Sequence, residues 1–234
     1  MIIKRIYTKL KKAIHSILLK AKVSYSQAGE DIIIEYLLNS IGINKPKYID
    51  IGANQPIKGN NTYLFYLKGC RGICIEPDIS LLPILKKERS KDSILNIGIS
   101  FSKAMLADFY YFENEHNAWN TFSKEDAIKK KEKTGIEFKT TKVELDTLNH
   151  ICEKYKFEDV NLISIDVEGL DLDILKSIDF SKIKAQVICV ETIAFSLNNT
   201  IKKNDEIISF MLLKNYVVYA DTNLNTIFCR KDLF

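Results

Sequence analysis

Short apolar runs alternate along the chain with stretches of helical periodicity. The apolar runs predict six strands, at Lys47–Ile51, Gly72–Ile75, Asn96–Ile99, Leu162–Val167, Ala185–Val190 and Tyr216–Ala220. Between them, apolar residues recur every three or four positions and predict helices over Thr62–Leu67, Ile79–Lys87, Asp146–Tyr155, Leu170–Ser177 and Asp205–Lys214. Strands that are apolar throughout and alternate with helices are typical of a parallel sheet covered on both faces.

The two ends of this region show separate patterns. Ser26 is a candidate N-cap for a further helix, which has acidic residues in its first turn and ends at Gly42. Near the C-terminus, Tyr216–Asp221 and Leu224–Cys229 are separated by a polar two-residue link. We therefore expect an antiparallel hairpin at one edge of the otherwise parallel sheet.

Residues 104–143 interrupt the alternation. They contain an aromatic strand at Phe109–Phe112, a polar aromatic stretch at Glu113–Phe122 and a lysine-rich helix at Lys124–Lys133. Long insertions in compact domains usually form lids or binding loops. We therefore expect a lid or substrate-binding insertion within a single domain over residues 24–234.

Residues 1–23 form a different pattern, a basic amphipathic helix. Its apolar positions recur every three or four residues, at Ile3, Ile6, Leu10, Ile14, Ile17 and Leu18. Residues 1–22 carry seven Lys and Arg side chains and no acid. Such a helix either lies on an anionic membrane surface or packs on its own domain or on a second subunit, as in a homo-oligomer.

Composition and charge narrow the function classes. The 234 residues are 46% hydrophobic and 27% charged, which is ordinary for a globular protein. The net charge is +4, but residues 23–234 alone carry −3, which speaks against a nucleic-acid partner. No apolar run approaches the roughly 20 residues that cross a bilayer, and no signal peptide is evident. The five scattered cysteines indicate reduced thiols, so we expect a cytoplasmic protein. If residues 1–22 lie on a membrane, its place is peripheral, at the inner face.

Candidate ligand-binding residues follow the first two strands. In an open α/β sheet, ligands bind beyond the carboxyl ends of the strands. Asp50, Gly52 and Asn54 follow the first strand, in a segment that matches neither the GxGxxG fingerprint nor a phosphate loop. Glu76 ends the second strand, where a carboxylate is suited to accept hydrogen bonds from ribose hydroxyls. Together they favour an adenosine-containing ligand.

Three further carboxylates follow later strands. Asp166 and Glu168 are two residues apart, so on an extended segment their side chains share a face. Glu191 ends the next strand, and neighbouring strands lie about 4.8 Å apart. Clustered acids raise one another's pKa and are candidates for proton transfer. Asp166 and Glu191 are also candidate oxygen ligands for Mg²⁺, whereas Glu168 or Asp171 could simply cap the following helix.

Four segments resemble the FkbM-type S-adenosylmethionine-dependent methyltransferases. They are the YIDIGANQ run at 48–55, GICIEPD at 72–78, LISIDVEGLDLDIL at 162–175 and SYSQAGED at 24–31. The resemblance covers roughly residues 24–230. It implies the class I methyltransferase fold, a Rossmann-like, seven-stranded, mostly parallel sheet with an antiparallel C-terminal hairpin strand and helices on both faces.

The resemblance also implies roles for individual residues. The methionine and ribose part of S-adenosylmethionine would be bordered by Asp50, Gly52 and Asn54. Glu76 would hold the ribose hydroxyls, and Asp166 and Glu168 lie where the acidic motif of the family faces the donor methyl. Pro56 stands where the family often has glycine, which alters the loop backbone. Many members methylate hydroxyls, so the resemblance implies an O-methyltransferase acting on a sugar, a glycan or a related metabolite.

An alcohol acceptor needs a general base. Asp166 or Glu168 is the first candidate and His116, in the insertion, is the second; the alternative for His116 is a solvated loop histidine without a role. Residues on the acceptor side of the site would be Trp119, Asn120 and Glu191. Trp119 is suited to stack on a sugar ring, but a lone tryptophan often forms the core of a lid.

Two other functions fit parts of the sequence. One is a Rossmann-type NAD-dependent oxidoreductase, against which the missing GxGxxG counts. The other is a catalytically inactive methyltransferase fold that serves as a scaffold at a membrane, for which residues 1–22 are the best support.

Overall fold

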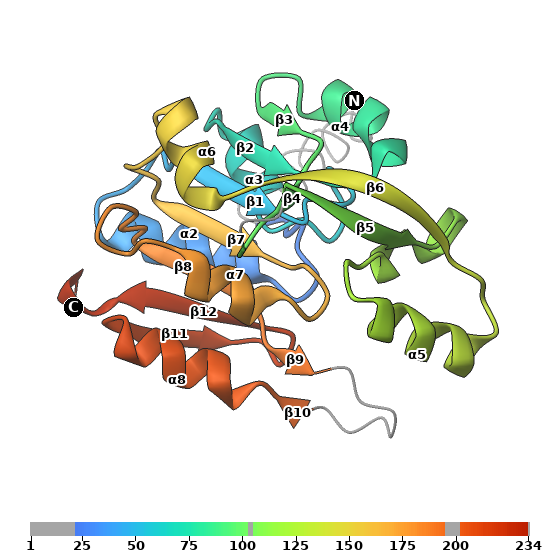
Figure 1. The fold of residues 1–234 in the computed structure, drawn as a ribbon. Helices are drawn as coiled ribbons and strands as arrows, with labels where there is room; N and C mark the ends of the chain where they lie inside the picture. The colour runs from blue at the N-terminus through green and yellow to red at the C-terminus, as the bar shows by residue number, and fades with distance from the viewer. Residues whose placement is uncertain (1–21, 103–104, 195–201, 234) are drawn as a thin grey trace, which may run out of the picture.

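The fold is built on one seven-stranded sheet (Figure 1). The computed structural model describes residues 22–102, 105–194 and 202–233. In order across the sheet the strands are β11 (Tyr216–Asp221), β12 (Asn225–Arg230), β8 (Val187–Glu191), β7 (Leu162–Ile165), β1 (Tyr48–Ile51), β2 (Gly72–Ile75) and β3 (Ser93–Leu95). The strands from β8 to β3 are parallel, and β12 is antiparallel to both β8 and β11. The predicted mostly parallel sheet with its antiparallel C-terminal hairpin is confirmed.

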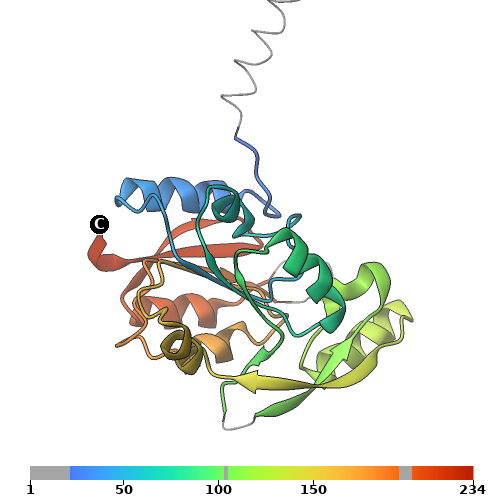
Figure 2. The same ribbon diagram turned by 90° about the horizontal axis from the view of Figure 1, so that it is seen from above.

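Helices cover both faces of this sheet (Figure 2). On one face lie α2 (Glu30–Ser40), α3 (Tyr63–Leu67) and α4 (Leu82–Glu88), which continues from the turn η1 (Ile79–Leu81). On the other face lie α6 (Leu148–Tyr155), α7 (Asp171–Ser177) and α8 (Asp205–Leu213). Alternate strand residues point to opposite faces: Ile49 and Ile51 pack with the second group, and Tyr48 packs with α2. Because the strand residues that point to either face are apolar, each face of the sheet packs against its own layer of helices.

The order of the strands creates a ligand crevice. From β1 the chain moves outward to β3, and it then returns to place β7 on the other side of β1. The connections after β1 and β7 therefore diverge, and a crevice opens at their carboxyl ends, which is the usual ligand position in such sheets.

The insertion forms a second, smaller layer beside that crevice (Figures 1 and 2). Its three-stranded sheet has the order β4 (Gly98–Ile99), β6 (Lys139–Asp146) and β5 (Leu106–Tyr111). The turn η2 (Asn114–Trp119) and α5 (Lys124–Thr134) lie between β5 and β6. The short elements β9 (Ile193–Ala194), β10 (Lys202–Lys203) and η3 (Lys231–Leu233) complete the described chain.

The predicted strand Asn96–Ile99 is confirmed only for Gly98–Ile99, which form β4, and its expected place in the main sheet is wrong. The sheet uses β3 instead, and β4 pairs with β6 of the insertion. Asn96 lies between β3 and β4. Its side-chain amide donates hydrogen bonds to the carbonyls of Glu76 and Pro77, so this residue belongs to neither strand. Strand β6 was not predicted, because its first half is exposed and rich in lysine and threonine.

The first described helix starts later than the sequence predicts. The helix α2 begins one turn later than the predicted cap: Gly29 is the N-cap, while the Ser26 hydroxyl accepts hydrogen bonds from the backbone N–H of Gly29 and of Asp31. The predicted helix over residues 1–23 lies outside the described residues, apart from its last two positions. Over the described ranges, no helix has the length and apolarity that a bilayer crossing needs.

Candidate functional site

A cavity of about 230 Å³ opens at the carboxyl ends of β1, β2, β7 and β8. Its walls also include the segment before α3 and the inner side of the insertion. Most of the residues predicted for the site line it: Asp50, Gly52, Asn54, Glu76, Asn120, Asp166, Glu168 and Glu191. His116 and Trp119 are absent from its lining.

The loop after β1 passes very close to the loop after β7. Gly52 has a φ of +78°, and a Cβ at this position would lie 1.9 Å from the carbonyl oxygen of Asp166. Only glycine fits this contact. Asn54, with a φ of +43°, continues the turn, and its buried side-chain oxygen has no hydrogen-bond partner among the described residues. The turn therefore presents to the cavity a hydrogen-bond acceptor that has no donor among the described residues.

Glu76 is fixed by two backbone N–H groups. One carboxylate oxygen accepts from Asn54 at 2.7 Å and the other accepts from Asp78 at 2.8 Å. Burial raises the pKa of Glu76 to about 7, although the two hydrogen bonds oppose the rise. Each oxygen keeps one lone pair, so Glu76 can still accept from a diol.

Asp50 belongs to a buried polar network under the loop. Its carboxylate accepts from the side chains of Asn60 and Thr62, and Arg89 donates to both of these residues. Arg89 is fully buried and is also paired with Asp92 at 2.8 Å. Burial raises the pKa of Asp50, and the Arg89 charge opposes the rise. Sequence reasoning missed this arginine, because nothing in its local pattern distinguishes it from the basic surface of a helix.

Asp166, Glu168 and Glu191 form what we call the carboxylate cluster. One oxygen of each lies within 4.8 Å of an oxygen of the others. The expected convergence is observed, but the extended segment is not: Glu168 has a φ of +54°. Asp171 holds this turn by accepting from the N–H groups of Val167 and Gly169.

Two members of the cluster, Asp166 and Glu191, are protonated more readily than isolated acids. Burial, followed by the charges of Glu168 and Asp171, raises the pKa of Asp166 well above its ordinary value. Burial and the charges of Asp166 and Glu168 raise the pKa of Glu191 as well. In its deprotonated form, a carboxylate with a raised pKa is a stronger proton acceptor than an isolated acid, and this is the form that a general base requires.

Lys130, on α5, links the insertion to the cluster. Its ammonium donates to Glu168 at 2.8 Å and to the carbonyl of Trp119 at 3.1 Å, and the residue is only 4% exposed. One member of the lysine run of α5 is therefore buried. This ion pair neutralises Glu168, whereas Asp166 and Glu191 form no ion pair with any described residue.

The aromatic residues of the insertion face one another. The Trp119 ring stacks on His116, with centroids 4.6 Å apart, and packs edge-on against Phe112. Trp119 thus contributes to the core of the insertion, and the roles suggested for it and for His116 stay predictions. Asn120 does reach the cavity, and its side chain bonds both Asp78 and the backbone of Phe112.

Together, the sheet order, the glycine turn after β1 and the acid after β2 define a class I methyltransferase of the S-adenosylmethionine-dependent kind. The sequence model described as the Methyltransferase FkbM domain matches residues 50–218, most of the chain. The chain therefore belongs to the FkbM methyltransferase family.

Solved structures give weaker likenesses. A TehB-like S-adenosylmethionine-dependent methyltransferase from Corynebacterium glutamicum is 8% identical with a TM-score of 0.45, over 96% of this chain and 97% of that one. The 1,6-didemethyltoxoflavin-N1-methyltransferase of Burkholderia thailandensis, solved with S-adenosylhomocysteine, is 9% identical with a TM-score of 0.39, over 86% and 74%. These values add nothing to the assignment. No curated protein matches the sequence.

The cavity fits the cofactor of this class. Besides Asn54, the side-chain oxygen of Asn61 is buried at the cavity wall and has no hydrogen-bond partner within the described ranges. S-adenosylmethionine carries an ammonium group and ribose hydroxyls, which are donors for such oxygens and for Glu76. Its positive sulfonium is complementary to the carboxylate cluster.

Proposed function

We propose that this protein is an S-adenosylmethionine-dependent O-methyltransferase that acts on a hydroxyl group of a sugar, a glycan or a related metabolite. The observation that carries the proposal is the carboxylate cluster that lines the cavity, in which the pKa values of Asp166 and Glu191 are raised. A hydroxyl group is a weak nucleophile until its proton is removed, and the cluster supplies a base.

Different residues bind the cofactor and accept the proton. Glu76, with Asn54 and Asn61 nearby in the lining, holds the polar groups of the cofactor, which when bound supplies an electrophilic methyl group. Asp166 accepts the proton of the acceptor hydroxyl, because its carboxylate has no hydrogen-bond donor in the described structure while Glu168 is paired with Lys130. A placed base contributes roughly 10²–10⁴-fold to the rate.

The insertion would supply the acceptor side. Asn120 lies on the cavity wall between Asp78 and the backbone of Phe112, and Phe122 lies with it in the lining. A polar amide beside an aromatic ring is suited to a sugar, which has hydroxyl groups and an apolar ring face.

A divalent cation between Asp166 and Glu191 is a second candidate for activating the hydroxyl. The short separation of their oxygens favours it, and the positive charge of Lys130 beside Glu168 opposes it. Neither the family nor the neighbours supports a metal, so this stays a prediction.

The test is methyl transfer from isotopically labelled S-adenosylmethionine to a panel of sugars and polyols. We expect Asp166→Asn to abolish transfer and to retain S-adenosylhomocysteine binding. Asp173→Asn, which changes an exposed acid of α7, should leave both unchanged. Binding without transfer to any acceptor would instead favour the scaffold alternative, and equal transfer by Asp166→Asn would remove Asp166 as the base.

A further inference from the structure

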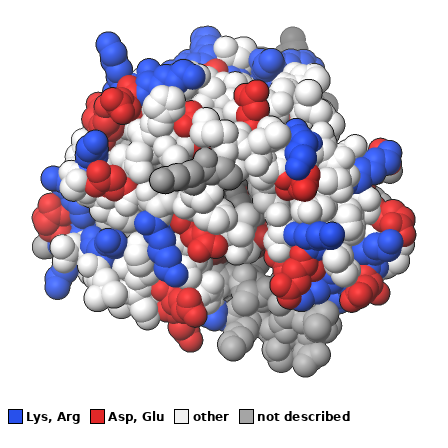
Figure 3. Space-filling view, in the orientation of Figure 1, with Lys and Arg blue, Asp and Glu red and all other residues white. Residues whose placement is uncertain are grey.

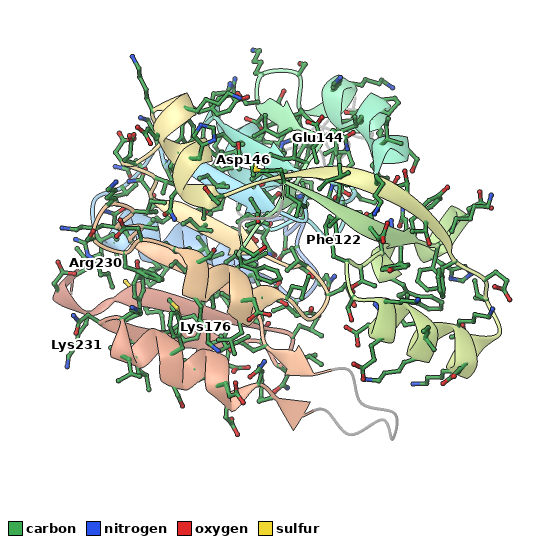
Figure 4. The ribbon with its side chains drawn as sticks, viewed as in Figure 1. Phe122, Glu144, Asp146, Lys176, Arg230 and Lys231 are labelled. Atoms are coloured by element: carbon green, nitrogen blue, oxygen red, sulfur yellow. The ribbon has the colours of Figure 1, made fainter. Side chains whose placement is uncertain are left out.

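A second pocket lies at the opposite end of the sheet from the carboxylate cluster. It is lined chiefly by Phe180, Lys184, Lys214, Tyr216, Arg230 and Lys231. Arg230 is the last residue of β12 and follows Cys229, which pairs with Val187 at the start of β8. Glu191 is the last residue of β8. The length of β8 alone therefore separates the two sites by about 13 Å. Figure 4 shows Arg230 and Lys231 on the far side of the molecule from Phe122.

The charges of this pocket are unbalanced. Four cationic side chains line it, and Asp232 is the acid among its lining residues. Asp232 is already paired with the Arg230 Nε at 2.6 Å. For Lys184 and Lys231, no ion pair or side-chain hydrogen bond exists within the described part of the chain. On the face in Figure 3 acids and bases are interspersed. Residues 23–234 carry a net charge of −3, so this pocket is a local positive centre.

The floor of the pocket is aromatic and rigid. The rings of Phe180 and Tyr216 meet at 69° with centroids 5.9 Å apart, and the Tyr216 hydroxyl donates to the carbonyl of Ala185 at 2.6 Å. Lys214 holds its ammonium 5.6 Å from the centroid of Phe180. The guanidinium of Arg230 is fixed by Asp232 and by the carbonyl of Lys184 at 3.0 Å. A fixed arginine above a rigid floor is preorganised for binding.

We infer that this pocket binds a phosphate-bearing ligand. The phosphate oxygens lie between Lys184, Lys231 and the free edge of Arg230, and an apolar or aromatic part of the ligand covers Phe180. Arginine and lysine together are the usual protein partners of phosphate, since they offer charge-assisted hydrogen bonds. The ligand is not the methyl acceptor, because the pocket lies at the opposite end of β8 from the carboxylate cluster. Two sources share this chemistry, a soluble diphosphate ester and the headgroup of an anionic lipid.

The test is calorimetric titration of the full chain with inorganic pyrophosphate. We expect one site, with binding at least tenfold weaker in the triple variant K184Q/K214Q/K231Q. The matched control is K86Q/K87Q/K91Q, which removes the same charge from exposed positions in and after α4 and should bind pyrophosphate as the wild type does. Glutamine keeps most of each side-chain stem, and neither variant touches the cofactor cavity, so both should bind S-adenosylhomocysteine normally.

Competition then distinguishes the sources. Vesicles of equal parts phosphatidylcholine and phosphatidylglycerol that displace pyrophosphate would identify a lipid headgroup, and displacement by a nucleoside diphosphate alone would identify a soluble ester. Absence of pyrophosphate binding to the wild type, or equal weakening in the two triple variants, would overturn the inference. Neither result would bear on the methyltransferase proposal, which the S-adenosylhomocysteine titration tests separately.

Discussion

Replacing Gly52 by alanine tests how closely the two loops at the cofactor cavity must approach. The new methyl carbon would lie 1.9 Å from the Asp166 carbonyl oxygen, so one loop must move by about 1 Å to reach even the shortest tolerated contact. That movement would displace Asp166 or the turn that carries Asn54. We therefore expect Gly52→Ala to lose stability and cofactor affinity together.

The magnitude has two parts. A residue with a side chain at a positive φ costs roughly 1–2 kcal/mol, and overpacking of a tight contact costs typically about 1–3 kcal/mol more. Gly135→Ala is the matched control, because Gly135 has a φ of +73° and no atom within 4 Å of an added Cβ. It should show the first cost alone and keep its cofactor affinity.

The assays are urea unfolding for the free energy of unfolding and calorimetry with S-adenosylhomocysteine. We expect Gly52→Ala to be less stable than Gly135→Ala by a few kcal/mol and to bind at least tenfold more weakly. Equal stabilities, or wild-type affinity in Gly52→Ala, would refute the close contact as the reason for this glycine.

Three further predictions concern the charges of the site. Arg89→Met should lower the free energy of unfolding by about 3–5 kcal/mol, because it leaves the Asp92 carboxylate buried without its cationic partner. The control is Arg71→Met, which removes a partly exposed arginine lying 5.0 Å from the Tyr66 ring. It should lower the free energy of unfolding by about 1 kcal/mol or less in the same assay. Glu76 and Asp171 both have a pKa raised to about 7 from ordinary values of 4.5 and 3.8, so the folded, ligand-free protein binds more protons than the unfolded chain between these values. Its stability, followed by thermal unfolding, should therefore fall as the pH rises from about 4 to about 7, and a rise over this range would contradict the burial of both acids. Finally, EDTA should leave methyl transfer unchanged if the carboxylate cluster acts as a base, whereas loss of activity restored by Mg²⁺ would establish the metal.

Much of the fold could be predicted because apolar pattern and topology agree. Each buried strand of the main sheet is a short apolar run between turn residues, and the strand ends then determine where Glu76, Asp166 and Glu191 lie. The resemblance of four segments added the seven-stranded sheet of a class I methyltransferase with its antiparallel hairpin strand. The error at Asn96–Ile99 arose because a short apolar run with a polar residue at its start looks the same whether it joins the main sheet or the insertion.

The missed residues depend on tertiary contacts. Lys130 sits within a run of lysines whose other members are partly or fully exposed, and only the position of α5 over the loop after β7 buries it. Arg89 and Asn61 likewise acquire their roles from neighbours far away in the sequence: Asn61 donates to Ser164 at 3.2 Å. Local periodicity carries no information about such partners.

The most direct test of the central claim is calorimetric titration of the wild type and of Glu76→Ala with S-adenosylhomocysteine, with Glu132→Ala, an exposed acid of α5, as control. A charged hydrogen bond contributes about 1.5–3 kcal/mol, so loss of Glu76 should weaken binding at least tenfold. The account predicts binding by the wild type and the control and a clear loss in Glu76→Ala. Unchanged binding in Glu76→Ala, or no binding by the wild type, would contradict the placement of the cofactor at the carboxyl ends of β1 and β2.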